Sequence, residues 1–195
     1  MAAESDQHGP RLTTKYYKKG EKKMSVATAD TSIETTKEEF FLAITRGELS
    51  DLRIAQEIID DGFDINTRDE EGRSCLHYCA EHNHIDFFKI LYNMGAYLAV
   101  RDKHGDTPLH LAVSFDRIEL AKFLIHNIQT QGLNVRANDG FTPLHCACYS
   151  GREEIAKILI EAGARVDIPD DGGNIPEYFA RLKKHKRIIK LFRRS

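Results

Sequence analysis

One tetrapeptide motif occurs three times along the chain, and its spacing constrains the fold more than any other feature. The copies are Ser74-Cys75-Leu76-His77, Thr107-Pro108-Leu109-His110 and Thr142-Pro143-Leu144-His145, with the histidines 33 and then 35 residues apart. A recurrence near 33 residues is typical of solenoids, in which each unit is a hairpin loop plus two short helices that cannot bury its apolar face alone. The spacing therefore predicts a stack of such units and directs the functional question toward a partner rather than a reaction.

The residues around each motif fit a helix–turn–helix unit. Thr107 and Thr142 are placed to cap a helix whose first turn contains Pro108 or Pro143, where a missing N–H costs nothing. The turn before each motif contains a glycine, for which a positive φ is easy: Gly72, Gly105 and Gly140. Between the two helices stand residues that tolerate a left-handed C-cap: Asn83, Asp116 and Gly151. These residues and the motif histidines are predicted to be structural.

The pattern resembles the ankyrin repeat over roughly 160 of the 195 residues. This resemblance implies an all-α ankyrin-repeat solenoid of about five helix–turn–helix units with short hairpin loops. We expect the repeats at about 36–68, 69–101, 102–136, 137–169 and 170–195. The first and last depart from the motif, as capping repeats do, because one face of each meets water.

The repeat domain, residues 36–195, is expected to follow a disordered tail, residues 1–35. The tail is basic and polar, with a cluster at Lys15–Lys23, and it lacks helical periodicity. Thr36 and Glu39 form a potential capping box, which predicts that the first helix begins at Thr36.

The composition predicts a cytoplasmic and/or nuclear protein. No apolar run approaches the length needed to cross a bilayer, and residues 1–20 lack the apolar stretch of a signal peptide. The four cysteines are then expected to be reduced thiols. No membrane partner is expected.

The formal net charge of −2 hides a strong separation of charge. Residues 37–180 hold 14 Lys and Arg against 25 Asp and Glu, a net charge of −11, whereas residues 181–195 hold 8 Lys and Arg and no acidic residue. Because an acidic body repels phosphate, the repeats themselves are not expected to bind nucleic acid. Weak contact by the basic termini is left as an alternative.

Neither an active site nor a metal site is predicted, and no cofactor is expected. The chain has no Gly-rich phosphate loop and no nucleophile or zinc-protease motif. Cys75, His77 and Cys79 invite a zinc interpretation, but their spacing differs from that of typical zinc ligands. Cys79 and Cys148 stand where alanine occupies the other motif, which predicts core packing. Cys146 is the one thiol expected near solvent.

A partner is expected to bind the concave face that the resemblance implies, formed by loop tips and first helices. Aromatic residues and arginine dominate binding hot spots. The candidate residues are Arg68, Glu70, Arg73, Arg101, Lys103, Asp106, Phe115, Arg136, Asn138, Phe141 and Tyr149. Two alternatives remain open: Phe115 and Tyr149 fold back onto the neighbouring repeat, and the arginines form salt bridges with Asp69, Asp102 and their neighbours in the acidic body.

The basic C-terminus has two interpretations. The apolar residues Ile188, Ile189, Leu191 and Phe192 repeat the spacing of earlier second helices, which predicts a closing cap helix. The basic patch beside them is a candidate nuclear-import or acidic-partner site: Lys183, Lys184, Lys186 and Arg187.

These observations favour a non-enzymatic protein-binding module, an adaptor or an inhibitor, that is monomeric alone and grips a protein partner of unspecified identity. One alternative is an inhibitor of a transcription factor that acts in the nucleus and covers a basic import segment with its acidic face. Another is a nucleic-acid-associated regulator that uses its basic termini.

Overall fold

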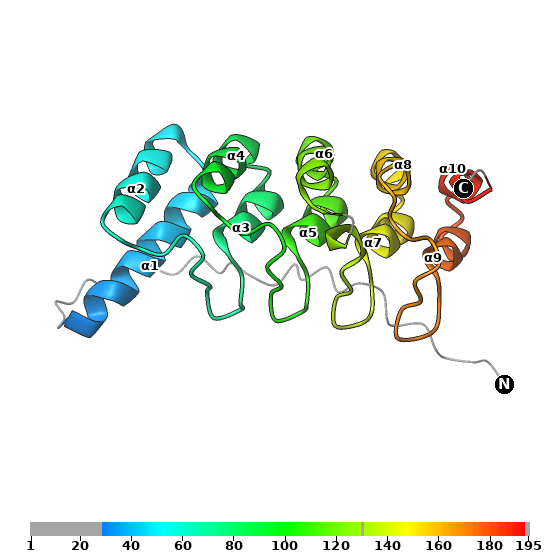
Figure 1. Cartoon of the computed structure of the whole chain (residues 1–195), viewed down its shortest axis with the longest axis horizontal. Coiled ribbons are helices and arrows are strands. Elements are labelled where there is room, and N and C mark those ends of the chain that lie inside the picture. Colours follow the sequence, from blue (N-terminus) through cyan, green and yellow to red (C-terminus); the bar gives the residue numbers. More distant parts are fainter. Residues whose placement is uncertain (1–28, 130, 194–195) are drawn as a thin grey trace.

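Ten α-helices in five pairs make up the part of the chain that the computed structural model describes, residues 29–129 and 131–193. They are α1 (Ala29–Arg46), α2 (Leu49–Asp60), α3 (Cys75–His82), α4 (Ile85–Asn93), α5 (Pro108–Ser114), α6 (Ile118–Asn127), α7 (Pro143–Ser150), α8 (Glu153–Glu161), α9 (Pro176–Leu182) and α10 (Lys186–Leu191), with a short 3-10 helix η1 (Gly132–Asn134) after α6. Figure 1 shows the odd-numbered helices in one row and the even-numbered helices in a second row, with the long loops projecting together beside the first row. This is the all-α repeat solenoid that the sequence predicts.

The internal first helices begin at the recurring motif because the motif histidine closes the cap. In α7 the backbone N–H of Thr142 donates to Nδ1 of His145 at 3.1 Å, and the backbone N–H of His145 donates to the Thr142 hydroxyl at 3.4 Å. The same return bond is made from the N-caps Ser74 (3.0 Å) and Thr107 (3.1 Å) in α3 and α5. The predicted caps are confirmed, and histidine takes the part that glutamate plays in an ordinary capping box.

The first helix begins earlier than the sequence predicts. α1 starts at Ala29 and Thr36 lies inside it, so Thr36 is not the N-cap. Between these residues the chain contains neither glycine nor proline, the residues that interrupt helices most strongly. The predicted tail, residues 1–35, therefore overlaps α1 over residues 29–35. Its other part, residues 1–28 with the basic cluster at Lys15–Lys23, lies outside the described residues.

The turns between paired helices have the predicted left-handed residues. Asn83 and Asp116 have φ of 63° and 59°, and Gly151 has φ of 74°. Short Asn and Asp side chains tolerate this conformation better than other non-glycine residues do, so the second helix of each pair folds back along the first.

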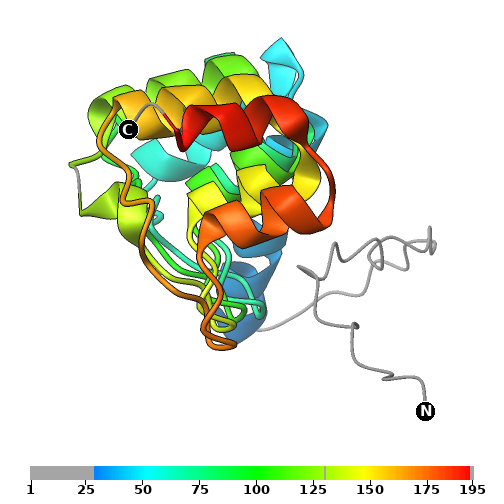
Figure 2. The same ribbon diagram turned by 90° about the vertical axis from the view of Figure 1, so that its right-hand side faces the viewer.

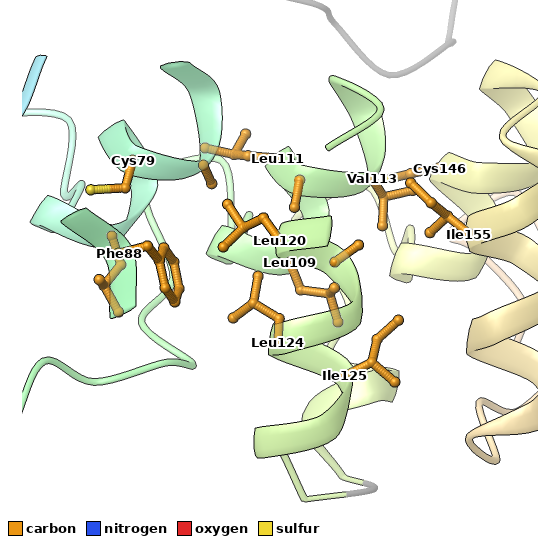
Figure 3. Packing of buried hydrophobic residues seen from close by; sticks show 14 of the residues in the cluster. Cys79, Phe88, Leu109, Leu111, Val113, Leu120, Leu124, Ile125, Cys146 and Ile155 are labelled. Atoms are coloured by element: carbon orange, nitrogen blue, oxygen red, sulfur yellow. The ribbon is translucent and has the colours of Figure 1, made fainter. Parts of the chain in front are cut away.

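The core runs continuously through the stack because each of the three internal helix pairs buries leucines between its neighbours. Leu109 of α5 and Leu120 and Leu124 of α6 are fully buried. They lie between a layer containing Phe88 on one side and a layer containing Ile155 on the other (Figure 3). No repeat has a complete core alone, so the stack is stabilised repeat against neighbouring repeat.

The last pair closes the stack through α10, which packs against α8 and α9. Ile188 is 1% exposed and is the buried anchor of this helix, whereas Ile189, Leu191 and Phe192 are partly buried against the core. The apolar stripe predicted for the closing helix is therefore present, with most of its burial at one residue.

Candidate protein-binding face and the hydrogen-bond ladders beneath it

The tips of the four long loops are joined backbone to backbone in a single row. The backbone N–H of Lys103 donates to the carbonyl of Glu71 at 2.8 Å. The next two bonds of the row run from Asn138 to His104 at 2.9 Å and from Asp171 to Asp139 at 3.1 Å. We call the side of the molecule formed by these tips and the adjoining ends of the first helices the loop-tip face. Its side chains stand on a backbone whose position is already fixed.

The three arginines predicted to bind a partner are instead engaged between loops. We call Arg68, Arg101 and Arg136 the arginine ladder. Each Nε donates to the carbonyl of the turn glycine four residues later, at distances from 2.8 to 3.3 Å. The terminal nitrogens reach the next loop: Arg101 donates to Oδ1 of Asn138 at 3.2 Å, and Arg136 pairs with Asp171 at 2.6 Å. Arg68 donates to the carbonyl of Arg101. Of these three contacts to the next loop, only that of Arg136 is an ion pair, and its partner is Asp171 rather than the expected Asp69 or Asp102; all three join neighbouring loops of the stack.

Removing one of these arginines is expected to weaken folding. Arg101→Ala is predicted to lower the free energy of unfolding by about 1–2 kcal/mol, because it breaks two charge-assisted hydrogen bonds, one within its own loop to Gly105 and one to Asn138 of the next loop. Arg53→Ala is the matched control, since Arg53 makes only an exposed pair with Glu57 and should lose about 0–0.5 kcal/mol. Urea unfolding measures both changes. Equal losses in the two variants would contradict the structural assignment of the ladder.

The motif histidines form a second ladder, buried under the loops. The Nε2 atoms of His77, His110 and His145 lie 3.1 Å from the carbonyl oxygens of Asp106, Phe141 and Asn174 in the next repeat. A carbonyl can only accept, so Nε2 donates, and Nδ1 accepts from the helix cap. This pattern requires a neutral ring. Burial lowers the pKa of all three histidines, to about 4 for His77 and His110.

A third ladder was not found from the sequence. At the N-caps of α4, α6, α8 and α10, a cationic side chain or an imidazole bonds a carbonyl at the end of the preceding repeat's first helix. The bonds are His84 to Thr45 (3.1 Å), Arg117 to Glu81 (2.8 Å), Arg152 to Ser114 (3.2 Å) and His185 to Tyr149 (3.3 Å). The signal was available, because His or Arg occupies this position at the repeat spacing.

The predicted aromatic anchors are largely engaged within the stack. Phe141 is only 3% exposed and packs on Phe179 with ring centroids 4.9 Å apart. Its expected place on an exposed surface is therefore corrected: the position just before the motif faces the next repeat. Phe115 and Tyr149 are half-buried, with the Arg117 guanidinium 5.9 Å from the Phe115 ring and the Lys183 amine 4.4 Å from the Tyr149 ring. Tyr149 therefore folds onto the neighbouring repeat, whereas the cation over the Phe115 ring belongs to its own repeat.

The remaining candidates divide into exposed and engaged residues. Glu70 and Lys103 are exposed at the loop tips. Asn138 is exposed but bonds the neighbouring loop through the Lys103 carbonyl at 2.6 Å. Arg73 is half-buried and pairs with Glu81 at 2.6 Å.

Asp106 is half-buried beneath the loop tips. Burial, followed by the charges of Asp102 and Asp139, raises its pKa to about 7. The loop-tip face therefore presents exposed tip residues above a layer of buried, interacting polar groups.

The four thiols belong to the core. Cys75, Cys79, Cys146 and Cys148 are all buried and unpaired. Burial raises each pKa above the usual value, to about 12 for Cys75. The expectation that Cys146 lies near solvent is wrong, because its position packs against the preceding repeat (Figure 3). Among the described residues, no group of three or more His, Cys, Asp or Glu side chains is placed to hold a metal ion.

The basic patch lies on the last repeat. Lys183, Lys184, Lys186 and Arg187 are exposed, and Arg187 pairs with Glu153 of the preceding repeat at 3.3 Å. Within residues 29–129 and 131–193, no helix combines the length and apolar content needed to cross a membrane.

Comparison with known proteins gives a family match that covers most of the chain. A family model described as "Ankyrin repeats (3 copies)" matches residues 40–134, 100–170 and 126–193. A putative ankyrin repeat protein of Rickettsia bellii is 30% identical over 108 residues, which are 54% of this chain and 64% of that protein.

Two further relatives are much longer than the matched region. A putative ankyrin repeat protein of Acanthamoeba polyphaga mimivirus is 38% identical over 69 residues, 35% of this chain and 10% of that protein. The NF-kappa-B inhibitor cactus of Drosophila melanogaster is 38% identical over 71 residues, 36% of this chain and 14% of that protein. The chain thus spans only a small part of these two relatives, and the similarity is confined to repeats.

Proposed function

The chain belongs to the ankyrin-repeat family, a family of protein-interaction modules, and on this premise we propose that it is a non-enzymatic adaptor or inhibitor that binds a protein through the loop-tip face. One observation carries the proposal. The exposed side chains of this face stand on a row of loop tips that is fixed by three backbone hydrogen bonds between neighbouring loops. A surface that is ordered before it meets its partner loses little conformational entropy on binding. The unit that binds is the repeat domain, including all of α1.

The proposed contact residues are the exposed tip residues that differ between repeats, and not the arginine ladder, whose side chains are also exposed but are engaged between loops. They are Glu70, Lys103, His104 and Asp139, with Phe115 and Tyr149 at the ends of the first helices as half-buried neighbours. The arginine ladder and Phe141 are left out, because their side chains already bind other parts of the stack.

A charge-reversal experiment tests the face. The loop-tip variant carries Glu70→Lys, Lys103→Glu and Asp139→Lys, and the control variant carries Lys89→Glu, Glu119→Lys and Lys157→Glu on the exposed sides of the second helices. The unmodified chain is first used to capture binding proteins from cells. We expect the loop-tip variant to capture about tenfold less of these proteins and the control variant to capture as much as the unmodified chain. Melting temperatures establish that both variants fold. Loss from the control alone would refute the proposed face.

A second candidate function is inhibition of a transcription factor in the nucleus or cytosol. It is favoured by the similarity of part of the chain to an NF-kappa-B inhibitor and by the net charge of −11 over residues 37–180, which complements a basic import segment. A synthetic Lys- and Arg-rich import peptide distinguishes it: this candidate requires the peptide to bind the unmodified chain and to bind the loop-tip variant differently. The alternative of nucleic-acid contact by the basic termini requires binding to duplex DNA that falls steeply with added salt.

A further inference from the structure

The outer face of α9 exposes positions that earlier repeats bury. In α7 the positions of Thr142 and His145 lie against the next repeat and are 1% and 0% exposed. The equivalent residues of the last repeat are Ile175 and Tyr178, which are 39% and 44% exposed, and Leu182 one turn further on is 39% exposed. Figure 2 shows α9 and α10 at the end of the stack, with no helix of another repeat in front of them.

The three exposed residues form one stripe, because a spacing of three and then four residues returns to the same side of a helix. Half of the large apolar residues that are exposed in the described parts of the chain fall in this stripe: the full set is Leu42, Ile54, Tyr97, Ile175, Tyr178 and Leu182. We call Ile175, Tyr178 and Leu182 the end stripe.

The end stripe is not built to receive another repeat of the same kind. Tyr178 stands where a motif histidine would donate to the next repeat, and Pro169 stands where the arginine ladder would continue. Ile175 replaces the hydroxyl N-cap residue. The groups that join one repeat to the next are therefore exchanged for apolar side chains, so a partner of different structure fits the stripe better.

A run of positive charge follows this apolar stripe along the chain. Seven Lys and Arg side chains fall within residues 181–193 and no acidic residue does. Arg181 pairs with Glu177 at 2.6 Å and Arg187 with Glu153. Lys184, Lys186 and Lys190 make no ion pair with any described residue. We call these three exposed lysines of the same repeat the basic rim; their unpaired charge attracts carboxylates.

We propose that the end stripe and its basic rim dock an amphipathic segment of another protein that has apolar residues on one side and acidic residues beside them. Tyrosine and arginine are enriched at such anchoring sites. Charge disfavours three other occupants of the end stripe: a second copy of the same face, the N-terminal residues 1–28 and an anionic membrane. A second copy of this face repels its like, residues 1–28 are themselves basic with 6 Lys and Arg against 3 Asp and Glu, and the acidic body opposes an anionic membrane. The proposal does not depend on the loop-tip face, because it rests on residues of the last repeat alone.

The test uses a fluorescent synthetic peptide with leucine on one helical face and glutamate on the other, and measures its binding to the full chain by anisotropy. The stripe variant carries Ile175→Thr, Tyr178→His and Leu182→Ser, which are residues that earlier repeats carry at the same positions. We expect its affinity to fall about tenfold or more. Tyr97→Ser is the matched control, because Tyr97 is 66% exposed but lies in the second repeat, and its affinity should not change.

A second variant keeps the test independent of how well the stripe variant folds. Lys184→Gln, Lys186→Gln and Lys190→Gln alter only exposed charges, so folding should persist while peptide affinity falls and its salt dependence flattens. A peptide with lysine in place of glutamate should not bind. The proposal is overturned if both variants bind the acidic peptide as the unmodified chain does. It is also overturned if the unmodified chain binds vesicles containing phosphatidylserine, or associates with itself, through the end stripe more tightly than it binds the peptide.

Discussion

In an Asp106→Asn variant, lowering the pH from 7 to 5 is expected to reduce the free energy of unfolding by roughly 4 kcal/mol. In the unmodified chain the same pH change should reduce it by about half as much. The loss comes from His77 and His110, whose pKa values burial lowers from 6.5 to about 4. Below pH 6.5 the unfolded chain takes up protons that the folded chain cannot. The stability that depends on neutral histidines is therefore fully present above pH 6.5, the pKa in the unfolded chain, and is lost as the pH falls toward 4. His145, whose pKa is lowered in the same direction, adds to the loss.

Asp106 acts in the opposite direction. Its pKa in the folded chain is raised from 3.8 to about 7, so between these values the folded chain binds a proton that the unfolded chain has released. Acidification from pH 7 therefore recovers stability through Asp106 and hides part of the histidine effect. Urea unfolding at several pH values separates the two contributions, with Glu70→Gln as an exposed carboxylate control. Identical pH profiles for the unmodified chain and Asp106→Asn would contradict this assignment.

Alanine in place of Gly105 is expected to lower the free energy of unfolding by about 3 kcal/mol or more, whereas alanine in place of Gly173 should cost only about 1–2 kcal/mol. Both glycines occupy the same turn position, with φ of 79° and 81°. A Cβ on Gly105 would lie 2.6 Å from the Arg101 guanidinium and 2.7 Å from the backbone nitrogen of Asn138 in the next loop.

Gly173 isolates the conformational cost, because a Cβ there meets no described atom within 4 Å. The difference between the two variants therefore measures how closely one loop tip packs on the next. Thermal or urea unfolding of both proteins gives that difference directly. If Gly105→Ala is no more costly than Gly173→Ala, the loop tips are not packed as the backbone row requires.

The sequence predicts the solenoid well because its signals are local and repeated. Motif, cap and turn residues each fix a helix end within a few residues; Thr107 and Thr142 cap as expected, and Ser74 caps the equivalent helix α3. The start of α1 was placed too late at Thr36, because a residue that can cap a helix is also tolerated inside one. The spacing gives the repeat, but it does not say where an isolated first helix begins.

The candidate site was harder to predict, because the next repeat in the stack decides which side chains of a given repeat are covered. Phe141 and the arginine ladder stand just outside the motif, where a single repeat would leave them exposed. Stacking places Phe141 against Phe179 and brings Arg136 to Asp171. The arginines recur at the repeat spacing, and this recurrence reflects contacts between repeats as much as contacts with a partner, whereas Phe141 has no aromatic counterpart in the other repeats. Tip residues that do not recur, such as Glu70 and Lys103, are better candidates for recognition.

Site-specific photo-crosslinking in cells tests the central claim, that a protein partner covers the loop-tip face. A photoreactive amino acid is placed at His104 or Asp139 on the loop tips and, for comparison, at Lys89 or Lys157 on the second helices, all of which are exposed. We predict that both loop-tip positions crosslink to the same protein and that the second-helix positions do not. Crosslinks to that protein from Lys89 and Lys157, with none from His104 and Asp139, would contradict the account.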